Sequence, residues 1–330
     1  MNRRDVIAFV AAAGLARWPV RAAEPAAFLE ETWTDAERRR DLPVRLRWPA
    51  GGQPCGLVIH SHGLGGSRAG GAAWGEAWQA AGLAVLHLQH PGSDSAVWQS
   101  GGLRGARRAA SARQFGERIA DAHFVIDELE RRHGQGGDWS RLRLDAIGFS
   151  GHSFGARLTQ ALAGERSTRM RAARAAHIAD ARPRAFIAFS PGFNEREGLD
   201  DAALAARFGA ISRPFLSLTG SDDEAMLVGD ASNAARRAVY RGLPAGQKAQ
   251  LVLDGADHMS FGGGTGLSES PAGQAWRRGP RAAALEAQHR RVIAAITADW
   301  WRWRLLGDEA ARLRLRAPVG LAAADLWEQG

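Results

Sequence analysis

The chain has 330 residues but only one cysteine, one tyrosine and four methionines. Because Cys55 is the only cysteine, no disulfide can form within the chain, and cysteine usage does not indicate the compartment. Apart from its N-terminus, the sequence has no apolar stretch that approaches the roughly 18 uninterrupted residues of a transmembrane helix. We therefore expect no stable membrane anchor.

Lysine is also scarce, since Lys248 is the only lysine among 43 basic residues, and the formal net charge is +8. The arginines are scattered and interleaved with aspartate and glutamate, and the longest run is 38–40. No RNA- or DNA-binding motif accompanies them. We interpret the charge as solvated helix faces and expect no nucleic-acid partner, although weak attraction to anionic surfaces stays open.

The N-terminus has the pattern of a bacterial signal peptide. Basic residues come first, a short apolar stretch follows, and small residues surround positions 20–22. The pair Arg3 and Arg4 favours the twin-arginine route. The sequence therefore predicts a signal peptide at 1–23, one catalytic domain at 24–330, and a periplasmic or secreted location.

Residues 151–155 read Gly-His-Ser-Phe-Gly, a G-x-S-x-G pattern. An apolar-alternating stretch of strand type, 142–149, precedes it, and a stretch of good helix formers, 156–163, follows. A serine on such a strand-to-helix turn is exposed, and the two glycines allow the backbone to pack closely around it. This context predicts that Ser153 is a nucleophile.

A second glycine-rich turn, 62–66, follows the short apolar stretch 56–61. Such a turn can direct backbone N–H groups at one point and supply half of an oxyanion hole, and the residue after the nucleophile supplies the other half. We assign these N–H groups to Leu64 and Phe154. Taken alone, the turn could equally be an ordinary tight turn.

Two further strand ends carry an acid and a histidine. The stretch 214–219 leads to Asp222 and Asp223, and the stretch 250–253 leads to His258. Each acid alone would be interpreted as a solvated loop residue. The order serine, aspartate, histidine at successive strand ends is that of the α/β-hydrolases, and it predicts a catalytic triad.

Four segments together resemble the predicted bacterial dienelactone-hydrolase-like group, namely 61–66, 90–94, 151–156 and 255–261. That group is related to platelet-activating-factor acetylhydrolases and, more distantly, to bacterial cutinase-like polyester hydrolases. The resemblance spans roughly residues 30–305. It implies an α/β-hydrolase fold, with a mostly parallel central sheet and helices on both faces. It also implies that Ser153 is the nucleophile, His258 the base, and Leu64 and Phe154 the oxyanion donors.

The chain departs from the secreted animal acetylhydrolases at the position of the acid. In those enzymes the acid follows the strand after the nucleophile helix, and here the matching place, after 184–189, is Ser190. We therefore expect the acid on the next strand. The usual spacing, three residues after a glycine, favours Asp223, and Asp222 is the alternative.

Four other histidines are close enough in sequence to suggest a metal site. His60 and His62 would share one side of a strand, and His87 and His90 are close in sequence, but no cysteine or glutamate completes a set. We expect no metal and no cofactor. His60 and His87 are instead expected to be nearly buried strand ends, and His152 to pack beside the nucleophile turn.

The remaining pattern fits the same fold. Residues 42–48 alternate like an antiparallel strand, 83–88 is typical of a buried parallel strand, and apolar positions at helical spacing occur in 115–129 and 292–303. The Gly-, Ser- and Arg-rich segments 92–112 and 262–280 are predicted as long surface loops.

The expected activity is hydrolysis of carboxylic esters, with short acyl groups, through an acyl-enzyme. An amidase or peptidase, or a polyester hydrolase, would use the same residues. A dienelactone-type hydrolase normally uses a cysteine nucleophile, which Ser153 argues against. A non-catalytic binding module on this scaffold is the contrasting class, and it would usually have lost a triad member. The sequence leaves the acyl chain, the alcohol and the oligomeric state open.

Overall fold

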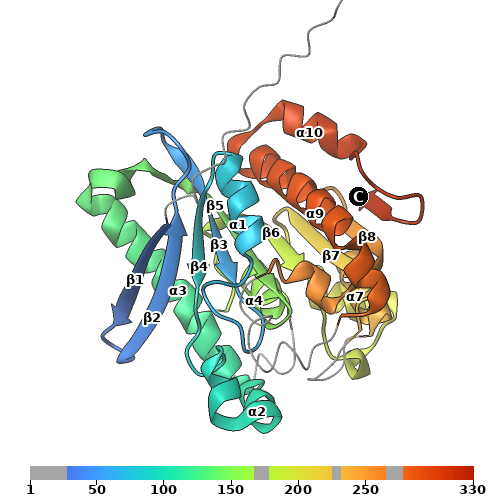
Figure 1. Cartoon of the computed structure of the whole chain (residues 1–330), viewed down its shortest axis with the longest axis horizontal. Coiled ribbons are helices and arrows are strands. Elements are labelled where there is room, and N and C mark those ends of the chain that lie inside the picture. The colour runs from blue at the N-terminus through green and yellow to red at the C-terminus, as the bar shows by residue number, and fades with distance from the viewer. Residues whose placement is uncertain (1–27, 167–177, 225–231, 265–277) are drawn as a thin grey trace, which may run out of the picture.

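The computed structural model describes residues 28–166, 178–224, 232–264 and 278–330 (Figure 1). The predicted signal peptide, 1–23, lies outside the described residues, so this segment and the domain boundary at residue 24 stay predictions. Most of 262–280, predicted as a loop, also lies outside them.

In the described residues one sheet of nine strands runs through the molecule, in the order β1-β2-β4-β3-β5-β6-β7-β8-β9. The six strands from β4 to β8 are parallel, and antiparallel pairing occurs only at the two edges. The strand bounds are β1 Phe28–Asp35, β2 Arg40–Arg47, β3 Cys55–Ser61, β4 Ala84–Leu88, β5 Leu142–His152, β6 Pro183–Phe189, β7 Phe215–Asp222, β8 Lys248–Asp257 and β9 Leu326–Gln329.

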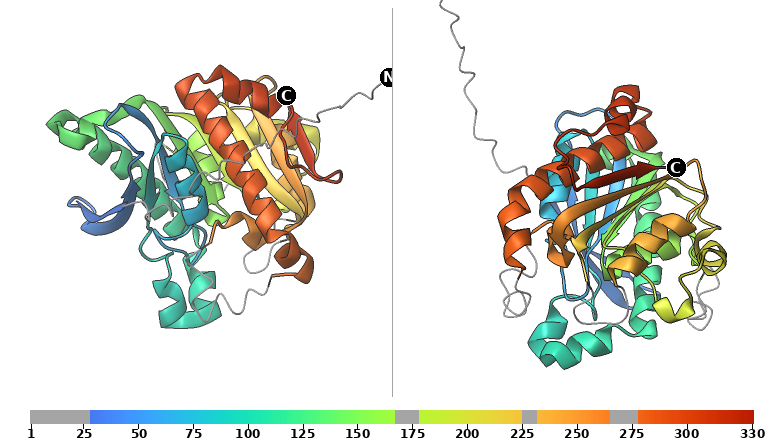
Figure 2. Two further views of the ribbon diagram at one scale, coloured as in Figure 1. Left: turned by 45° about the horizontal axis from the view of Figure 1, so that its top comes forward. Right: turned by 90° about the vertical axis from the view of Figure 1, so that its right-hand side faces the viewer.

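Helices cover both faces of this sheet (Figures 1 and 2). One face packs against α1, α9 and α10, and the other against α3, α4, α6 and α7. The α-helix bounds are α1 Ala72–Ala80, α2 Ala96–Ala109, α3 Ala112–Gln135, α4 Phe154–Ala163, α6 Asp201–Phe208, α7 Asn233–Gly242, α9 Pro280–Leu306 and α10 Glu309–Arg316; short 3₁₀ turns are η1 Gly137–Arg141, η2 Glu195–Glu197 and η3 His258–Phe261.

The apolar strands explain the two layers. Every residue of β3 and β4 is buried, and successive side chains enter opposite cores: Leu57 and Ile59 pack with α3 and α4, whereas Val58 packs with α1 and α9. Strands buried on both faces are typical of parallel sheets covered by helices on each side. The predicted mostly parallel sheet with helices on both faces is therefore confirmed.

The helical faces predicted from spacing are also present. In α3, Ile119, Ala122, Ile126 and Leu129 are buried in one core, and the Ser111 side chain accepts a hydrogen bond from the Gln114 N–H at the helix start. In α9, Val292, Ile296 and Trp300 are buried in the other core, with Trp303 packed against it. The tryptophans of α9 thus belong to the core, as expected.

The prediction of a loop over 92–112 is wrong, because α2 occupies Ala96–Ala109. Its glycines do not prevent the helix; they allow a kink at Gly102, where φ is 48° and ψ is −137°. The edge strands β1 and β9 were also not expected from the sequence. Both pair antiparallel at an edge, where a partner strand can stabilise a weakly patterned segment.

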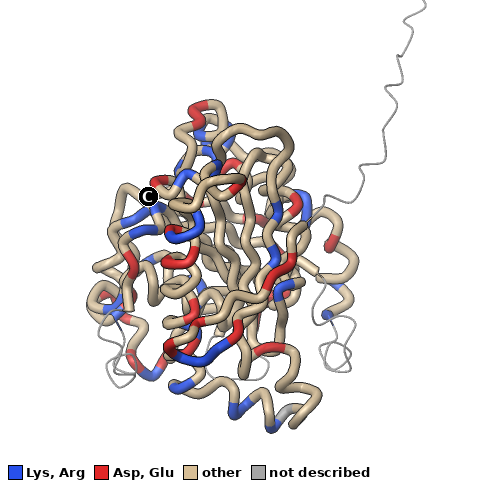
Figure 3. The backbone as a smooth tube through the Cα atoms, turned by 90° about the vertical axis from the view of Figure 1, so that its left-hand side faces the viewer, with Lys and Arg blue, Asp and Glu red and all other residues tan. Residues whose placement is uncertain are grey.

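Charged residues of both signs are interleaved over most of the molecule (Figure 3). Many arginines pair with carboxylates of their own helix, such as Arg131 with Glu128 and Arg312 with Glu309. Such exposed pairs contribute little to stability. Among the described residues, no helix combines the length and apolarity needed to cross a membrane.

Five of the buried histidines have a strongly lowered pKa and predict a marked pH dependence of stability. Burial lowers the pKa of His87 and His152 to about 3 and that of His90 to about 4, and it lowers the pKa of His60 and His62 well below the usual value. Between these values and about pH 6.5 the unfolded chain binds more protons than the folded chain. The free energy of unfolding therefore falls as pH falls through this window.

From pH 7.5 to 6.0 we expect a loss of about 0.8 kcal/mol for each of the five histidines, or about 4 kcal/mol together. Urea unfolding at the two pH values measures this difference. A change of less than about 1 kcal/mol would contradict the neutral, buried state of these side chains.

Candidate active site

The nucleophile candidate lies on a sharp turn between β5 and α4. Ser153 has φ of 55° and ψ of −109°, a conformation that a residue with a side chain adopts only under strain. Its N–H donates to the Phe189 carbonyl at 2.9 Å, which fixes the turn to β6. The Ser153 side chain is partly exposed.

The two glycines of the motif are needed for close packing. A Cβ on Gly151 would lie 2.3 Å from the Gly155 carbonyl oxygen, and a Cβ on Gly155 would lie 2.1 Å from the Ser61 carbonyl oxygen. Any other residue at either position would push the turn away from β3. This contact holds the nucleophile turn against the glycine-rich loop that follows β3.

The acid and the histidine meet at the carboxyl ends of β7 and β8. His258 Nδ1 lies 2.8 Å from Asp223 Oδ1, and both side chains are buried. Asp222 is exposed and accepts a hydrogen bond from Ser221. Of the two candidate acids, the structure brings Asp223 and not Asp222 to the histidine.

Besides His258, two contacts hold the Asp223 carboxylate. The Thr219 hydroxyl donates to Oδ2 at 3.0 Å, and Arg236 Nε lies 2.9 Å from Oδ1. Burial by itself raises the pKa of Asp223, but the Arg236 guanidinium and His258 together hold this pKa below its usual range. Asp223 is therefore ionised and acts as an acceptor for the Nδ1–H of His258.

His152, which was expected to pack beside the nucleophile turn, contacts His258. Its Nε2–H donates to the His258 carbonyl at 3.0 Å, and the two rings lie 4.8 Å apart. Because the pKa of His152 is about 3, its ring is neutral at pH 7. It can position the His258 backbone without adding a charge next to the imidazole.

Ser153 follows β5 and His258 follows β8, with β6 and β7 between these strands, and their side chains share no hydrogen bond within the described part of the chain. The Ser153 turn is adjacent to His152, which contacts His258 directly. In proteins without substrate such catalytic hydrogen bonds are often long and tighten only when substrate binds.

Leu64 lies in the loop after β3, and its N–H was predicted to bind the oxyanion. Gly65 N–H donates to the Ser93 carbonyl and Gly66 N–H to the Gly63 carbonyl, whereas Leu64 N–H has no acceptor among the described residues. Phe154 is the first residue of α4, where N–H groups lack a helical partner. Neither of the two N–H groups predicted from the sequence therefore has a backbone acceptor among the described residues.

Ser190 lies immediately after β6, at the position that matches the acid of the animal acetylhydrolases. It is buried, and its carbonyl accepts a hydrogen bond from Arg236 at 2.8 Å. The position is therefore part of the scaffold that holds Arg236 beside Asp223.

A second Ser–His–Asp series lies beneath the loop. Asp121 Oδ2 is 2.9 Å from His90 Nδ1, and His90 Nε2 is 2.9 Å from the Ser61 hydroxyl. All three side chains are fully buried, so no substrate reaches Ser61. Arg38 and Arg40 also bind the Asp121 carboxylate. Burial raises the pKa of Asp121, but the contacts of His90 and Arg40 lower it to about 2.

Among the described residues, no group of three or more His, Cys, Asp and Glu side chains could hold a metal ion. The histidines instead pack in pairs, His60 edge-on against His87 and His62 tilted against His90. As expected, His60 and His87 are buried.

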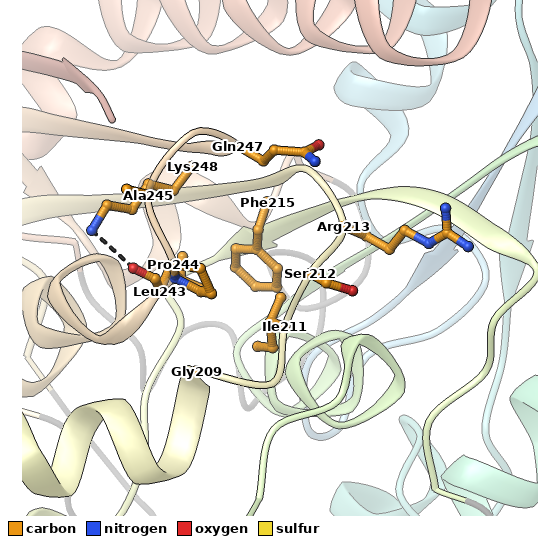
Figure 4. A pocket seen from close by; sticks show the side chains of 10 residues that line it. All are labelled: Gly209, Ile211, Ser212, Arg213, Phe215, Leu243, Pro244, Ala245, Gln247 and Lys248. Atoms are coloured by element: carbon orange, nitrogen blue, oxygen red, sulfur yellow. Dashed lines mark hydrogen bonds between the residues drawn. The ribbon is translucent and has the colours of Figure 1, made fainter.

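A hollow of about 330 Å³ lies at the opposite end of the strands (Figure 4). It is formed at the start of β7 and β8 and includes Phe215 and Lys248, whose ammonium donates to the Leu243 carbonyl. Since Asp223 and His258 are at the other ends of these strands, this hollow is not part of the candidate site.

Sequence reasoning did not identify Thr219, Arg236 or Arg118. Arg236 lies thirteen residues beyond Asp223, on α7, and contacts it only through the fold. No local pattern marks such a residue. Thr219 lies four residues before the acid, but a threonine within a strand gives no sequence signal of a functional role.

Comparisons with known proteins show the fold. No family model matches the chain, and no curated protein is similar to it in sequence. A solved structure of a 2,6-dihydroxy-pseudo-oxynicotine hydrolase is similar, with 17% identity, a TM-score of 0.52, and coverage of 86% of this chain and 69% of that chain. A dienelactone hydrolase from Anabaena variabilis is similar with 19% identity, a TM-score of 0.50, and coverage of 84% and 99%. The strand order, the nucleophile turn and these two likenesses together show that this chain has the α/β-hydrolase fold.

Proposed function

We propose that this protein is a serine hydrolase that cleaves carboxylic esters. Ser153 attacks the acyl carbonyl, His258 takes the hydroxyl proton and returns it to the leaving alcohol, and Asp223 orients the imidazole. Water, activated by His258, then hydrolyses the acyl-enzyme. The N–H groups of Leu64 and Phe154 stabilise the oxyanion in both steps.

One observation carries the proposal: a buried, ionised Asp223 binds His258 Nδ1 at 2.8 Å beside a serine held at positive φ. This hydrogen bond leaves Nε2 as the free acceptor that a general base requires. The two structural neighbours are both hydrolases by name, which supports the reaction class. No cofactor is needed for this mechanism.

We infer short acyl esters as the substrate class, from the resemblance to acetylhydrolases. A p-nitrophenyl ester series from acetate to palmitate tests this inference, with kcat/KM expected to be highest at acetate or butyrate. A maximum at palmitate would overturn the inference of short acyl groups but not the proposed esterase activity. Absence of hydrolysis across the series, with turnover of a p-nitroanilide instead, would replace the esterase by an amidase. Release of soluble products from a polyester film would identify a polymeric substrate.

We also propose export through the N-terminal segment. If Arg3 and Arg4 direct twin-arginine transport, the double variant Arg3→Lys with Arg4→Lys leaves the precursor in the cytoplasm, because the receptor recognises the arginine pair. Cell fractionation followed by immunoblotting measures the distribution. Normal periplasmic recovery of the double variant would indicate the general secretory route, and recovery of wild type in the cytoplasm would contradict export.

A further inference from the structure

Arg118, on α3, is a fully buried arginine that touches both halves of the proposed oxyanion hole. Its Nη1 donates to the His62 carbonyl at 2.7 Å, and its Nη2 donates to the Gly63 carbonyl at 3.3 Å. On its other side, its Cζ lies 4.5 Å from the centre of the Phe154 ring. One guanidinium thus joins the loop after β3 to the residue that follows the nucleophile.

The guanidinium uses all its donors. Besides the two loop carbonyls, its Nε donates to the Ser93 hydroxyl at 2.8 Å, Nη2 to the Ser93 carbonyl at 3.3 Å, and Nη1 to the Ser61 hydroxyl at 3.5 Å. These five acceptors match the five N–H groups of an arginine. Burial lowers the pKa of Arg118 to about 9, so the group stays protonated at neutral pH.

Neighbouring groups fix the direction of the hydrogen bonds that His90 and His62 make beside Arg118. The ionised Asp121 takes the Nδ1–H of His90, so His90 Nε2 accepts from the Ser61 hydroxyl. The backbone N–H of His90 donates to His62 Nε2 at 3.1 Å, so His62 Nδ1–H donates to the Gly63 carbonyl at 2.6 Å. The buried Ser–His–Asp series is therefore a support for this loop and not a second reactive centre.

These contacts determine where the Leu64 N–H points. In a trans peptide the carbonyl and the N–H point in opposite directions. The Gly63 carbonyl is held toward Arg118 and His62, so the Leu64 N–H of the same peptide points away from them. Together with the Gly66 N–H, these groups make three donors on the Gly63 oxygen, which polarise this peptide and make its N–H a stronger donor.

We propose that Arg118 is the positioning residue of the oxyanion hole, holding the Leu64 and Phe154 peptides in the orientation that binds the developing oxyanion. This proposal rests on the proposed function. Arg118 has no contact with substrate in this role, since it is fully buried behind the loop and the Phe154 ring. Its effect on the reaction passes through the two peptides.

The variant Arg118→Lys tests the proposal. A lysine keeps the charge but has three N–H donors on one atom, and it cannot bridge both carbonyls and both Ser93 acceptors. Loss of one oxyanion donor typically costs about 10²- to 10³-fold in kcat, so we expect a displaced donor to cost about 10- to 100-fold, with KM changed less than about threefold. Rates are divided by the concentration of Ser153 labelled with a fluorophosphonate, which removes any unfolded fraction.

A second measurement separates positioning from simple support of the fold. A boronic acid that forms a tetrahedral adduct with Ser153 should bind Arg118→Lys at least tenfold more weakly, because the adduct oxygen uses the oxyanion hole. The matched control is Arg207→Lys, a buried arginine of α6 that pairs with Glu165 at 2.6 Å. It should lose stability, but its kcat and boronate affinity per labelled site should stay within about threefold of wild type.

A fall in kcat and boronate affinity in Arg118→Lys, without the same fall in the control Arg207→Lys, supports the proposal. Values for Arg118→Lys within threefold of wild type overturn it. If Arg118→Lys does not fold, Ser93→Ala is used instead, because it removes the acceptor of the Arg118 Nε–H. In that variant a fall in kcat per labelled site of threefold or more at constant KM supports the proposal. An unchanged kcat per labelled site overturns it. If wild type neither hydrolyses esters nor labels at Ser153, it is the proposed function that fails.

Discussion

Ser153→Ala is expected to abolish ester hydrolysis, with kcat reduced by roughly 10⁶-fold. The remaining groups cannot form an acyl-enzyme, since the hydroxyl is the only group on the strained turn that can attack the carbonyl. Labelling by a fluorophosphonate probe should be lost in the same variant. Initial rates with p-nitrophenyl acetate and mass spectrometry of the labelled protein measure both effects.

Ser61 is the matched control for this experiment, because it is also hydrogen-bonded to a histidine that binds an aspartate. Its side chain is fully buried, so Ser61→Ala should still take up one equivalent of label, even if its rate is lower. Labelling of Ser153→Ala at the wild-type level, or a labelled peptide that contains Ser61, would show that the nucleophile is misassigned.

The parts of the site that sequence predicts well are those whose chemistry is local. The turn at Ser153 needs two glycines within five residues, and the contacts of Gly151 and Gly155 explain why. The acid and the histidine follow strands whose apolar residues are buried on both faces, so each is recognised from its own segment. The order of these segments then predicted the fold.

The residues that support the site could not be predicted in this way. Arg118 looks like one more arginine of a charged helix, and only the packing of α3 against the loop after β3 buries it. The helix α2 was missed because its glycines and arginines resemble a loop. Its Trp98 packs so closely on Gly65 that a Cβ there would lie 1.8 Å from Trp98 Nε1. Tertiary contacts, not local propensity, stabilise both features.

Asp223→Asn is expected to lower kcat by about 10⁴-fold, whereas Asp222→Asn should stay within a few-fold of wild type. Asparagine keeps the shape of the acid but can donate to Nδ1 and thereby favour the tautomer in which Nε2 carries the proton and cannot act as a base. It also removes the charge that stabilises the imidazolium. The charge matters here, because Asp223 is fully buried and, among the described residues, its carboxylate contacts Arg236 and His258 as ionisable side chains.

Asp222 is the matched control, since it is one residue away and exposed, and the donor to its carboxylate among the described residues is the Ser221 hydroxyl. Its asparagine variant should change stability by about 0.5 kcal/mol or less. Both variants are compared by kcat on p-nitrophenyl acetate and by urea unfolding. If Asp222→Asn lost kcat and Asp223→Asn kept it, the catalytic acid would be Asp222. That result would contradict the 2.8 Å contact of Asp223 with His258. If both variants keep near-wild-type kcat, neither aspartate orients His258, and the proposed triad fails at its acid.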